Sequence, residues 1–472
     1  MNAVVIGILA YVLLQLIVGA VVSRRIHSES DYLIAGRRLG YALATFTIFA
    51  TWFGAETCIG AAGAIAEDGL AGGAADPFGY GLCLLFMGLV FARPLWRLKL
   101  TTFGDLFRQR YGPAVERIAV IIMVPTSVLW AAAQVRAFGQ VLAAASEWQI
   151  ATTTTIAAVV VIVYTTMGGL LADAWTDLIQ GIALVGGLIV LFILMAGDGA
   201  LAGLAEVEPH RLNPFASAGE TMSLLQVLEA WALPVCGSVV AAELVSRVIA
   251  ARSPRVAQVS SIAATGMYLA VGMIPVTVGL LAGPLLGDDL ADPEHVLPLV
   301  AQRYLPGLLY ILFAGALVSA ILSTVDSALL AAGSLVSHNL IVPLRPAMSD
   351  HAKLRTARIF VAVFGVAAYT LALSAEGIYD LVKEASGFGS AGIFIVALAG
   401  LFTRIGGSAS AVASLLAGVI VWIAAAYVLP RLAIAENAWL SPLVEYPYLA
   451  SLVAAVLGYL SGTWPNSRAI SP

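Results

Sequence analysis

Charged residues are scarce in this chain of 472 residues: they make up 11% of it, against about 25% in an ordinary globular protein. Hydrophobic residues make up 60%, and the mean hydropathy is +0.95. So little charge argues against a string of soluble domains, and it argues equally against a protein that binds nucleic acid. The composition, with its 45 glycines, predicts a helical protein that crosses a lipid bilayer many times.

Cysteine is scarce as well. Cys58, Cys83 and Cys236 lie in apolar stretches without metal-ligand spacing, so we expect buried thiols. The sequence shows no pair of nucleophile and base and no cluster of metal ligands, so we do not expect an enzyme. Linker-like and low-complexity stretches are also missing, which predicts a single transmembrane domain over residues 1–472.

Long apolar runs are abundant. A helix needs about 20 apolar residues to cross the hydrocarbon core of a membrane. Thirteen segments qualify, and we number them span 0 to span 12. Their approximate limits are 2–22, 41–66, 76–97, 115–145, 149–166, 175–197, 223–250, 257–284, 306–338, 356–375, 379–402, 408–429 and 444–462. We therefore expect an all-α membrane protein with 13 transmembrane helices.

Lysine and arginine gather in alternate loops. If there are 13 spans, one side of the membrane holds all the basic residues that follow spans 0, 2, 6, 8 and 10 and the one in the tail. These are Arg24, Arg25, Arg37, Arg38, Arg93, Arg97, Lys99, Arg108, Arg110, Arg247, Arg252, Arg255, Arg345, Lys353, Arg355, Arg358, Arg404 and Arg468. The other loops hold only Arg211, Arg303 and Arg431. The positive-inside rule then places the N-terminus outside and the C-terminus in the cytoplasm.

Two spans carry helix breakers near their middle. Span 1 has Gly54 and Gly60, and span 6, five spans later, has Pro234 and Gly237. Transporters often contain two inverted repeats whose first helices are broken where the substrate binds. We therefore expect residues 41–197 (spans 1 to 5) and 223–402 (spans 6 to 10) to form two repeats. Residues 1–40 (first span and cytoplasmic loop) and 403–472 (two spans and a short tail) would then be peripheral.

The clearest polar pattern is in span 8. Ser319, Ser323, Ser327 and Ser334 share one helical face. Thr324 and Asp326 flank it. A carboxylate in the membrane normally faces a cavity, a partner or an ion, and oxygen ligands suit a hard cation such as sodium. The alternative is that these small polar residues serve helix packing and hydrogen bonds between helices.

Two further acids interrupt apolar runs. Asp177 opens span 5, where it binds an ion or caps the helix. Glu56 lies between the two glycines of span 1, where it neutralises a cationic ligand, pairs with a base, or bonds freed backbone amides. Other ionisable residues within spans are expected to pair with one another: Arg136, Glu229, Glu243, Lys383 and Glu384.

Two tryptophans lie deep in spans rather than at their ends. Trp52 comes two residues before Gly54, and Trp130 lies in the middle of span 3. Each can present a ring face to a substrate such as a quaternary ammonium ion, or can simply pack.

Five motifs follow one another along spans 0 to 8: DYLIAGR, TWFGAETCIGAAG, TTFGDLFRQRYG, YTTMGGLLADAWTDLIQ and SAILSTVDS. In this order they resemble the sodium:solute symporter family (solute carrier family 5-like). The resemblance implies the inverted-repeat fold of the amino-acid transporter LeuT, with spans 0, 11 and 12 peripheral. It also implies sodium as the coupling ion.

By motif match, the resemblance implies a principal sodium site formed by backbone carbonyls and hydroxyls of spans 1 and 8: Ala55, Cys58, Ala320, Ser323 and Thr324. Some members bind a second sodium ion, and the matching residues are Asp177, Ser323, Asp326 and Ser327.

Within the family, three stretches of this sequence are most similar to the choline transporter branch: WFGAETCIG, LWAAAQVRAFG and ELVSRVIAARSPRVAQ. The resemblance implies a tryptophan cage for the substrate ammonium group, to which Trp52 and Trp130 correspond. The third tryptophan is missing, because Ala241 takes its place in span 6, near Glu243. We expect a substrate site made of Trp52, Glu56, Thr57, Trp130 and Glu243.

The sequence therefore predicts a symporter of the bacterial inner membrane that imports a small organic solute, cationic, zwitterionic or amino-acid-like, with sodium and by alternating access. Its partners would be the solute, sodium and the lipid bilayer, with no nucleic acid and no obligate protein partner. Two alternatives stay open: a proton-coupled transporter of the same fold, and a transporter-like sensor that works with a separate signalling protein.

Overall fold

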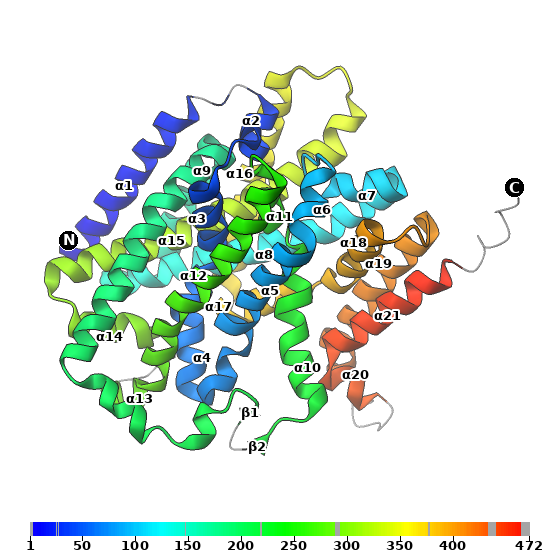
Figure 1. The fold of residues 1–472 in the computed structure, drawn as a ribbon. Coiled ribbons are helices and arrows are strands. Elements are labelled where there is room, and N and C mark those ends of the chain that lie inside the picture. Colours follow the sequence, from blue (N-terminus) through cyan, green and yellow to red (C-terminus); the bar gives the residue numbers. More distant parts are fainter. Residues whose placement is uncertain are drawn as a thin grey trace, which may run out of the picture.

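The computed structural model describes residues 3–463 except 25, 27, 147, 218–219, 288–292, 376–377 and 433–439. Arg25, Arg468 and the expected C-terminal tail lie outside this part. The described chain is a bundle of helices (Figure 1), and its only strands are the two-residue pair β1 (Ala216–Ser217) and β2 (Glu220–Thr221). The prediction of an all-α protein is confirmed apart from this short antiparallel ribbon.

Every expected span coincides with helix in the described residues. The helices that make up the spans are α1 (Ala3–Ser23), α3 (Tyr41–Trp52), α4 (Ala61–Asp68), α5 (Tyr80–Phe86), α6 (Ala92–Arg97), α8 (Pro113–Ala145), α9 (Ile150–Gly197), α10 (Leu224–Ala232), α11 (Ala242–Ala250), α12 (Pro254–Leu280), α15 (Gly307–Ser334), α16 (Asp350–Ser374), α17 (Ile378–Gly387), α18 (Ser390–Phe402), α19 (Ser408–Ile423) and α21 (Pro447–Ser461). Shorter helices connect them: α2 (Glu29–Ile34), α7 (Gly104–Tyr111), α13 (Ala282–Leu286), α14 (Val296–Tyr304) and α20 (Ser441–Glu445).

Eight helices of the described chain are long and apolar enough to cross a membrane, or nine if the bent pair Leu224–Val240 and Ala242–Ala250 is one span. One of them, α9, covers two expected spans in 48 residues. A straight helix of that length would measure about 72 Å, more than twice the thickness of the hydrocarbon core. It leaves helical geometry at Gly169, where φ is 59° and ψ is 175°. The count of 13 crossings stays a prediction.

Span 1 is broken directly after α3. Phe53 has a ψ of 70°, and the helix resumes as the π-helical turn η2 (Glu56–Gly60), which leads into α4. Glycine is required at Gly54, because a Cβ atom there would lie 2.7 Å from Thr324 Oγ1 and 3.0 Å from Gln134 Oε1. The break expected near Gly54 is thus present, whereas Gly60 lies inside the π-helical turn.

Span 6 bends at a different residue from the one expected. Pro234 and Gly237 lie in a second π-helical turn, η8 (Leu233–Gly237), and the chain turns by 50° at Ala241, where ψ is 130°. The α-helix expected to be interrupted near Pro234 and Gly237 does end at Ala232, and the irregular stretch that holds both residues leads to the bend at Ala241. Helix α10 runs directly into η8, so Pro234 lies inside a continuous helix, where it removes one backbone hydrogen bond.

Helix α15 forms the centre of the bundle. Every residue from Phe313 to Ser334 is buried, and the helix packs against α1, α8, α9 and α16. Helix α1 and the pair α19 and α21 lie at opposite edges (Figure 1), as expected for peripheral spans. The repeat boundaries at residues 41–197 and 223–402 stay predictions.

Candidate functional site

The break in span 1 lies against α15. Thr324 donates a hydrogen bond from its hydroxyl group to the carbonyl oxygen of Ala50 on α3, at 3.2 Å, and another to Ala320 within its own helix. All five candidate ligands of the principal sodium site are buried on the two segments that meet here: Ala55, Cys58, Ala320, Ser323 and Thr324. A helix break and a π-helical turn both free backbone carbonyls, so the junction offers carbonyl and hydroxyl oxygens together.

Three helices meet at the carboxylate of Asp177 on α9. Thr47 on α3 and Ser323 on α15 both donate their hydroxyl groups to it. Asp177 is fully buried, so it is not a solvated helix cap. This arrangement places Asp177 and Ser323 together, as two of the four residues expected around a second sodium ion.

The other two residues of that set, Ser327 and Asp326, have different partners. Ser327 contacts Asp173 on α9 and Arg247 on α11, while Asp326 accepts a hydrogen bond from Thr165 on α9. Ser327 also donates to the backbone carbonyl oxygen of Ser323 at 2.8 Å, so the four residues expected around the second sodium ion lie close together on α9 and α15, and this site stays a prediction.

Arg247 and Asp173 form a buried ion pair. Sequence analysis placed Arg247 in a cytoplasmic loop, and this is wrong, because the last turns of α11 are inside the bundle and the side chain is 0% exposed. Asp173 was missed because span 5 was expected to begin at 175, whereas α9 is helical from Gly169 onward. The spacing of four residues between Asp173 and Asp177 was the available signal, since it puts both acids on one helical face.

One face of α8 contacts three of the residues expected to bind substrate. Ser127 donates to Glu243 at 3.2 Å. Trp130 packs edge-on against Trp52, with ring centroids 4.7 Å apart. Because residues spaced by three and four share a helical face, Gln134 extends the same row one turn further, where it donates to Glu56 at 2.6 Å.

The aromatic part of this face has a third ring that sequence analysis did not single out. Tyr80 on α5 stacks on Trp52 at 5.3 Å and lies 5.9 Å from Trp130. The indole N–H groups of Trp52 and Trp130 have no hydrogen-bond partner among the described residues. Trp130 and Glu243 also line a small internal cavity, together with Ala241, Gly237 and Ser386.

The polar residues of the π-helical turn η2 point in two directions. Glu56 is fully buried, and its Oε1 atom has no hydrogen-bond partner among the described residues. Thr57 instead contacts Asp76 and Tyr268, at 2.7 Å each. The structure therefore brings Trp52, Trp130 and Glu56 together through α8, while Thr57 belongs to a separate polar cluster around Asp76.

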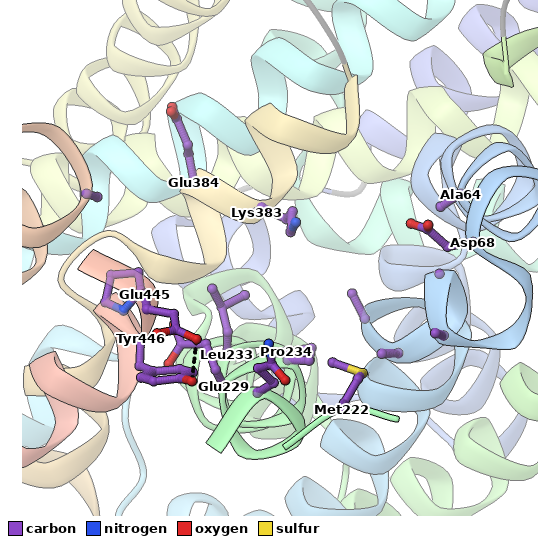
Figure 2. A pocket seen from close by; sticks show the side chains of 18 of the residues that line it. Ala64, Asp68, Met222, Glu229, Leu233, Pro234, Lys383, Glu384, Glu445 and Tyr446 are labelled. Carbon is purple, nitrogen blue, oxygen red and sulfur yellow. Dashed lines mark hydrogen bonds between the residues drawn. The ribbon is translucent and has the colours of Figure 1, made fainter. Parts of the chain in front are cut away.

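A larger cavity of about 880 Å³ opens at the end of the bundle where α4, α10, α17 and α20 meet (Figure 2). Four of its lining residues are acids and one is a lysine: Asp68, Glu229, Glu384, Glu445 and Lys383. Glu229 accepts hydrogen bonds from the backbone amides of Tyr448 and Leu449 at 2.7 and 2.8 Å, so it caps α21. Pro234 lines this cavity while Gly237, in the same turn, lines the small internal one.

The sequence profile of the sodium:solute symporter family matches residues 32–418. The human high affinity choline transporter 1 is 27% identical over 463 residues, which cover 94% of this chain and 78% of the human protein. The sodium/proline symporter of Haemophilus influenzae is 25% identical over 477 residues, which cover 96% of this chain and 93% of that protein.

Solved structures show the same fold. A sodium-coupled sialic acid symporter in a substrate-bound, outward-open state superposes with a TM-score of 0.81 at 18% identity, covering 99% of this chain and 97% of that one. Mhp1, a nucleobase-cation-symport-1 family transporter, superposes with a TM-score of 0.60 at 16% identity, covering 94% and 96%. These are transporters of the LeuT fold, and the inverted-repeat architecture is confirmed. The chain is a multi-pass membrane protein that belongs to the sodium:solute symporter family, whose function is the sodium-coupled symport of a small solute.

Proposed function

We propose that this symporter imports a small solute that carries an ammonium group, either a cation or a zwitterion. The observation that carries the proposal is that neighbouring turns of α8 hold the aromatic cluster of Trp52, Tyr80 and Trp130 and the buried carboxylate of Glu56, whose Oε1 atom has no hydrogen-bond partner among the described residues. A carboxylate neutralises an ammonium charge, and aromatic ring faces attract it. The named relatives are consistent with this class, since one carries choline and the other proline.

The acidic cavity of Figure 2 supports the same class of solute. Its four carboxylates outnumber the single lysine, so the cavity concentrates cations at its mouth. Two segments, η8 and α17, border both this cavity and the small one beside Trp130. We propose that the solute moves along η8 and α17 from the acidic cavity to the small cavity and the aromatic cluster beside it.

We further propose that sodium binds where span 1 meets α15, held by oxygens of Ala55, Cys58, Ala320, Ser323 and Thr324. Sodium at this junction would join α3 to α15 and favour the state that receives the solute. Because an ion that binds one conformation better than another shifts the population toward it, sodium binding and solute binding would support each other. The membrane potential, worth about 2.3 kcal/mol per charge per 100 mV, would then drive inward release.

The proposed location is the bacterial inner membrane, with the N-terminus outside. The acidic cavity, bounded by the loops after spans 1, 5, 9 and 11, would then face outward.

Purified protein in liposomes tests the function: radiolabelled choline and proline are supplied with an inward sodium gradient. Accumulation of either supports the proposal, and uptake of neutral sugars in preference to both contradicts it.

A further inference from the structure

Two hydroxyl groups and one carboxyl group form a closed ring inside the bundle. Asp76 lies in the π-helical turn η4 (Ala75–Gly79) of span 2, Thr57 in η2 of the broken span 1, and Tyr268 on α12. Thr57 Oγ1 lies 2.7 Å from Asp76 Oδ2 and 2.7 Å from the hydroxyl oxygen of Tyr268. That hydroxyl oxygen in turn lies 2.9 Å from Asp76 Oδ1. All three side chains are fully buried, so the ring joins three spans away from water.

The number of hydrogen atoms in this ring depends on the protonation of Asp76. A hydroxyl group can donate one hydrogen bond, and an ionised carboxylate can only accept. If Asp76 is ionised, Thr57 and Tyr268 supply two hydrogens for three contacts, and one contact brings lone pairs together at hydrogen-bond distance. A neutral carboxyl group supplies the third hydrogen. Each member of the ring then donates once and accepts once, in either direction around the ring.

The surroundings of Asp76 also favour the neutral acid. Its partners in the described chain are the two hydroxyl groups, and no basic side chain pairs with it there. Burying an isolated carboxylate is so costly that such a group usually takes up a proton instead. Both carboxyl oxygens already lie at hydrogen-bond distance from a hydroxyl group, so Asp76 has no free oxygen for a metal ion or a solute.

The neighbouring acid, Glu56, differs in this respect. It precedes Thr57 in η2 and is close enough to Asp76 for two negative charges to repel each other. Its Oε1 atom has no hydrogen-bond partner among the described residues. When two acids are close, ionising one of them makes it more costly to ionise the other. A proton on Asp76 therefore leaves the negative charge on Glu56, which has an oxygen available to a solute.

We propose that Asp76 carries a proton in this conformation and that the closed ring positions the break in span 1. The carbonyl oxygen of Trp52, the last residue of α3, lies 3.3 Å from both hydroxyl oxygens of the ring. The ring thus contacts the chain on both sides of the break, at Trp52 and at Thr57, and connects it to spans 2 and 7. Asp76 is a positioning residue, because it acts on the proposed substrate site through these two neighbours.

Infrared difference spectra of the purified full-length chain locate the proton. A neutral carboxylic acid has a C=O stretching band that is separate from the bands of a carboxylate. Asp76→Asn, whose amide can take the place of the neutral acid in the ring, is expected to lose the band of one neutral acid. Asp105→Asn is the matched control. Asp105 accepts hydrogen bonds from the backbone amides of Thr101 and Thr102, which favour the ionised form, so this variant should lose carboxylate bands instead.

Labelling of Cys58 tests the position of the break. Cys58 follows Thr57 in η2 and is fully buried. The background is a chain in which alanine replaces the other two cysteines. We expect a maleimide to modify Cys58 as slowly in Asp76→Asn as in this background. In Tyr268→Phe, which removes one donor and opens the ring, we expect modification to be roughly tenfold faster.

Loss of a neutral-acid band in Asp76→Asn, together with faster labelling in Tyr268→Phe, supports the proposal. Loss of carboxylate bands in Asp76→Asn would overturn the assignment of the proton, and equal labelling rates in all three chains would overturn the positioning role. An Asp76→Asn variant that does not fold would also contradict the proposal, because its amide supplies a hydrogen as the neutral acid does. Thr57→Val, which removes the other hydroxyl group, replaces Tyr268→Phe if that variant does not fold. Neither measurement needs sodium or a solute, so failure here leaves the proposed function intact.

Discussion

Ser323 on α15 donates its hydroxyl group to the carboxylate of Asp177 on α9, and Thr47 on α3 donates to the same carboxylate. One acid thus holds together three helices that belong to different parts of the chain. Helix α3 ends at the break in span 1, directly beside Thr324. The affinity of this junction for a cation would therefore depend on the relative positions of all three helices. Sodium bound at the proposed site would therefore affect the position of the broken span that carries the proposed substrate residues.

Replacing Thr324 with alanine tests the junction. The substitution removes a proposed sodium ligand and the hydrogen bond to Ala50 of α3. A hydrogen bond of this kind contributes about 1 to 1.5 kcal/mol, so we expect the sodium concentration for half-maximal uptake to rise about tenfold. Uptake into proteoliposomes at graded sodium concentrations measures this, with Ser334→Ala as the control. An unchanged sodium requirement would count against the site.

Replacing Glu56 with glutamine tests substrate recognition. The amide keeps the shape of the side chain and an oxygen that can accept from Gln134, but it removes the negative charge of the carboxylate. We expect uptake of an ammonium solute to fall at least tenfold, while sodium binding measured with ²²Na⁺ is kept. The control is Glu67→Gln, at an exposed acid near the end of α4. Normal transport by Glu56→Gln would show that this carboxylate does not bind the solute.

The helices could be predicted from the sequence, because long apolar runs are local signals, and local signals such as glycines and rare polar residues also suggest a candidate site on spans 1, 3, 6 and 8. The partners of buried charges could not. The sequence around Arg247 is typical of a loop, and only the three-dimensional structure shows that its side chain pairs with Asp173 on α9. Likewise, Tyr80 joins Trp52 and Trp130 through a contact between helices that no spacing along the chain reveals.

Breaking the ion pair between Arg247 and Asp173 is expected to destabilise the protein. Arg247→Met leaves the Asp173 carboxylate buried without its partner, which typically costs about 3 to 5 kcal/mol. The double variant Arg247→Met with Asp173→Leu removes both charges and should be less destabilised than the single variant. Unfolding temperatures in detergent measure the difference. If the double variant is the less stable of the two, the pair is not the reason for the burial of Arg247.

Gly169 provides a test of the break in α9. Its φ of 59° strains any residue with a side chain, and a Cβ atom would lie 2.4 Å from the Tyr32 ring. Backbone strain alone costs about 1 to 3 kcal/mol. We expect Gly169→Ala to lower the unfolding temperature. Gly186→Ala, in the same helix with open space around the new atom, should leave it unchanged or raise it slightly. Equal effects of the two substitutions would contradict a bend at Gly169.

The most direct test of the account compares the driving forces for uptake by the unmodified protein. Proteoliposomes are loaded without sodium, and accumulation of radiolabelled choline or proline is followed under an inward sodium gradient, or under a pH gradient in sodium-free buffer. We predict accumulation above the external concentration with the sodium gradient and none with the pH gradient. Accumulation driven by the pH gradient without sodium would contradict the claim that sodium bound between span 1 and α15 drives transport.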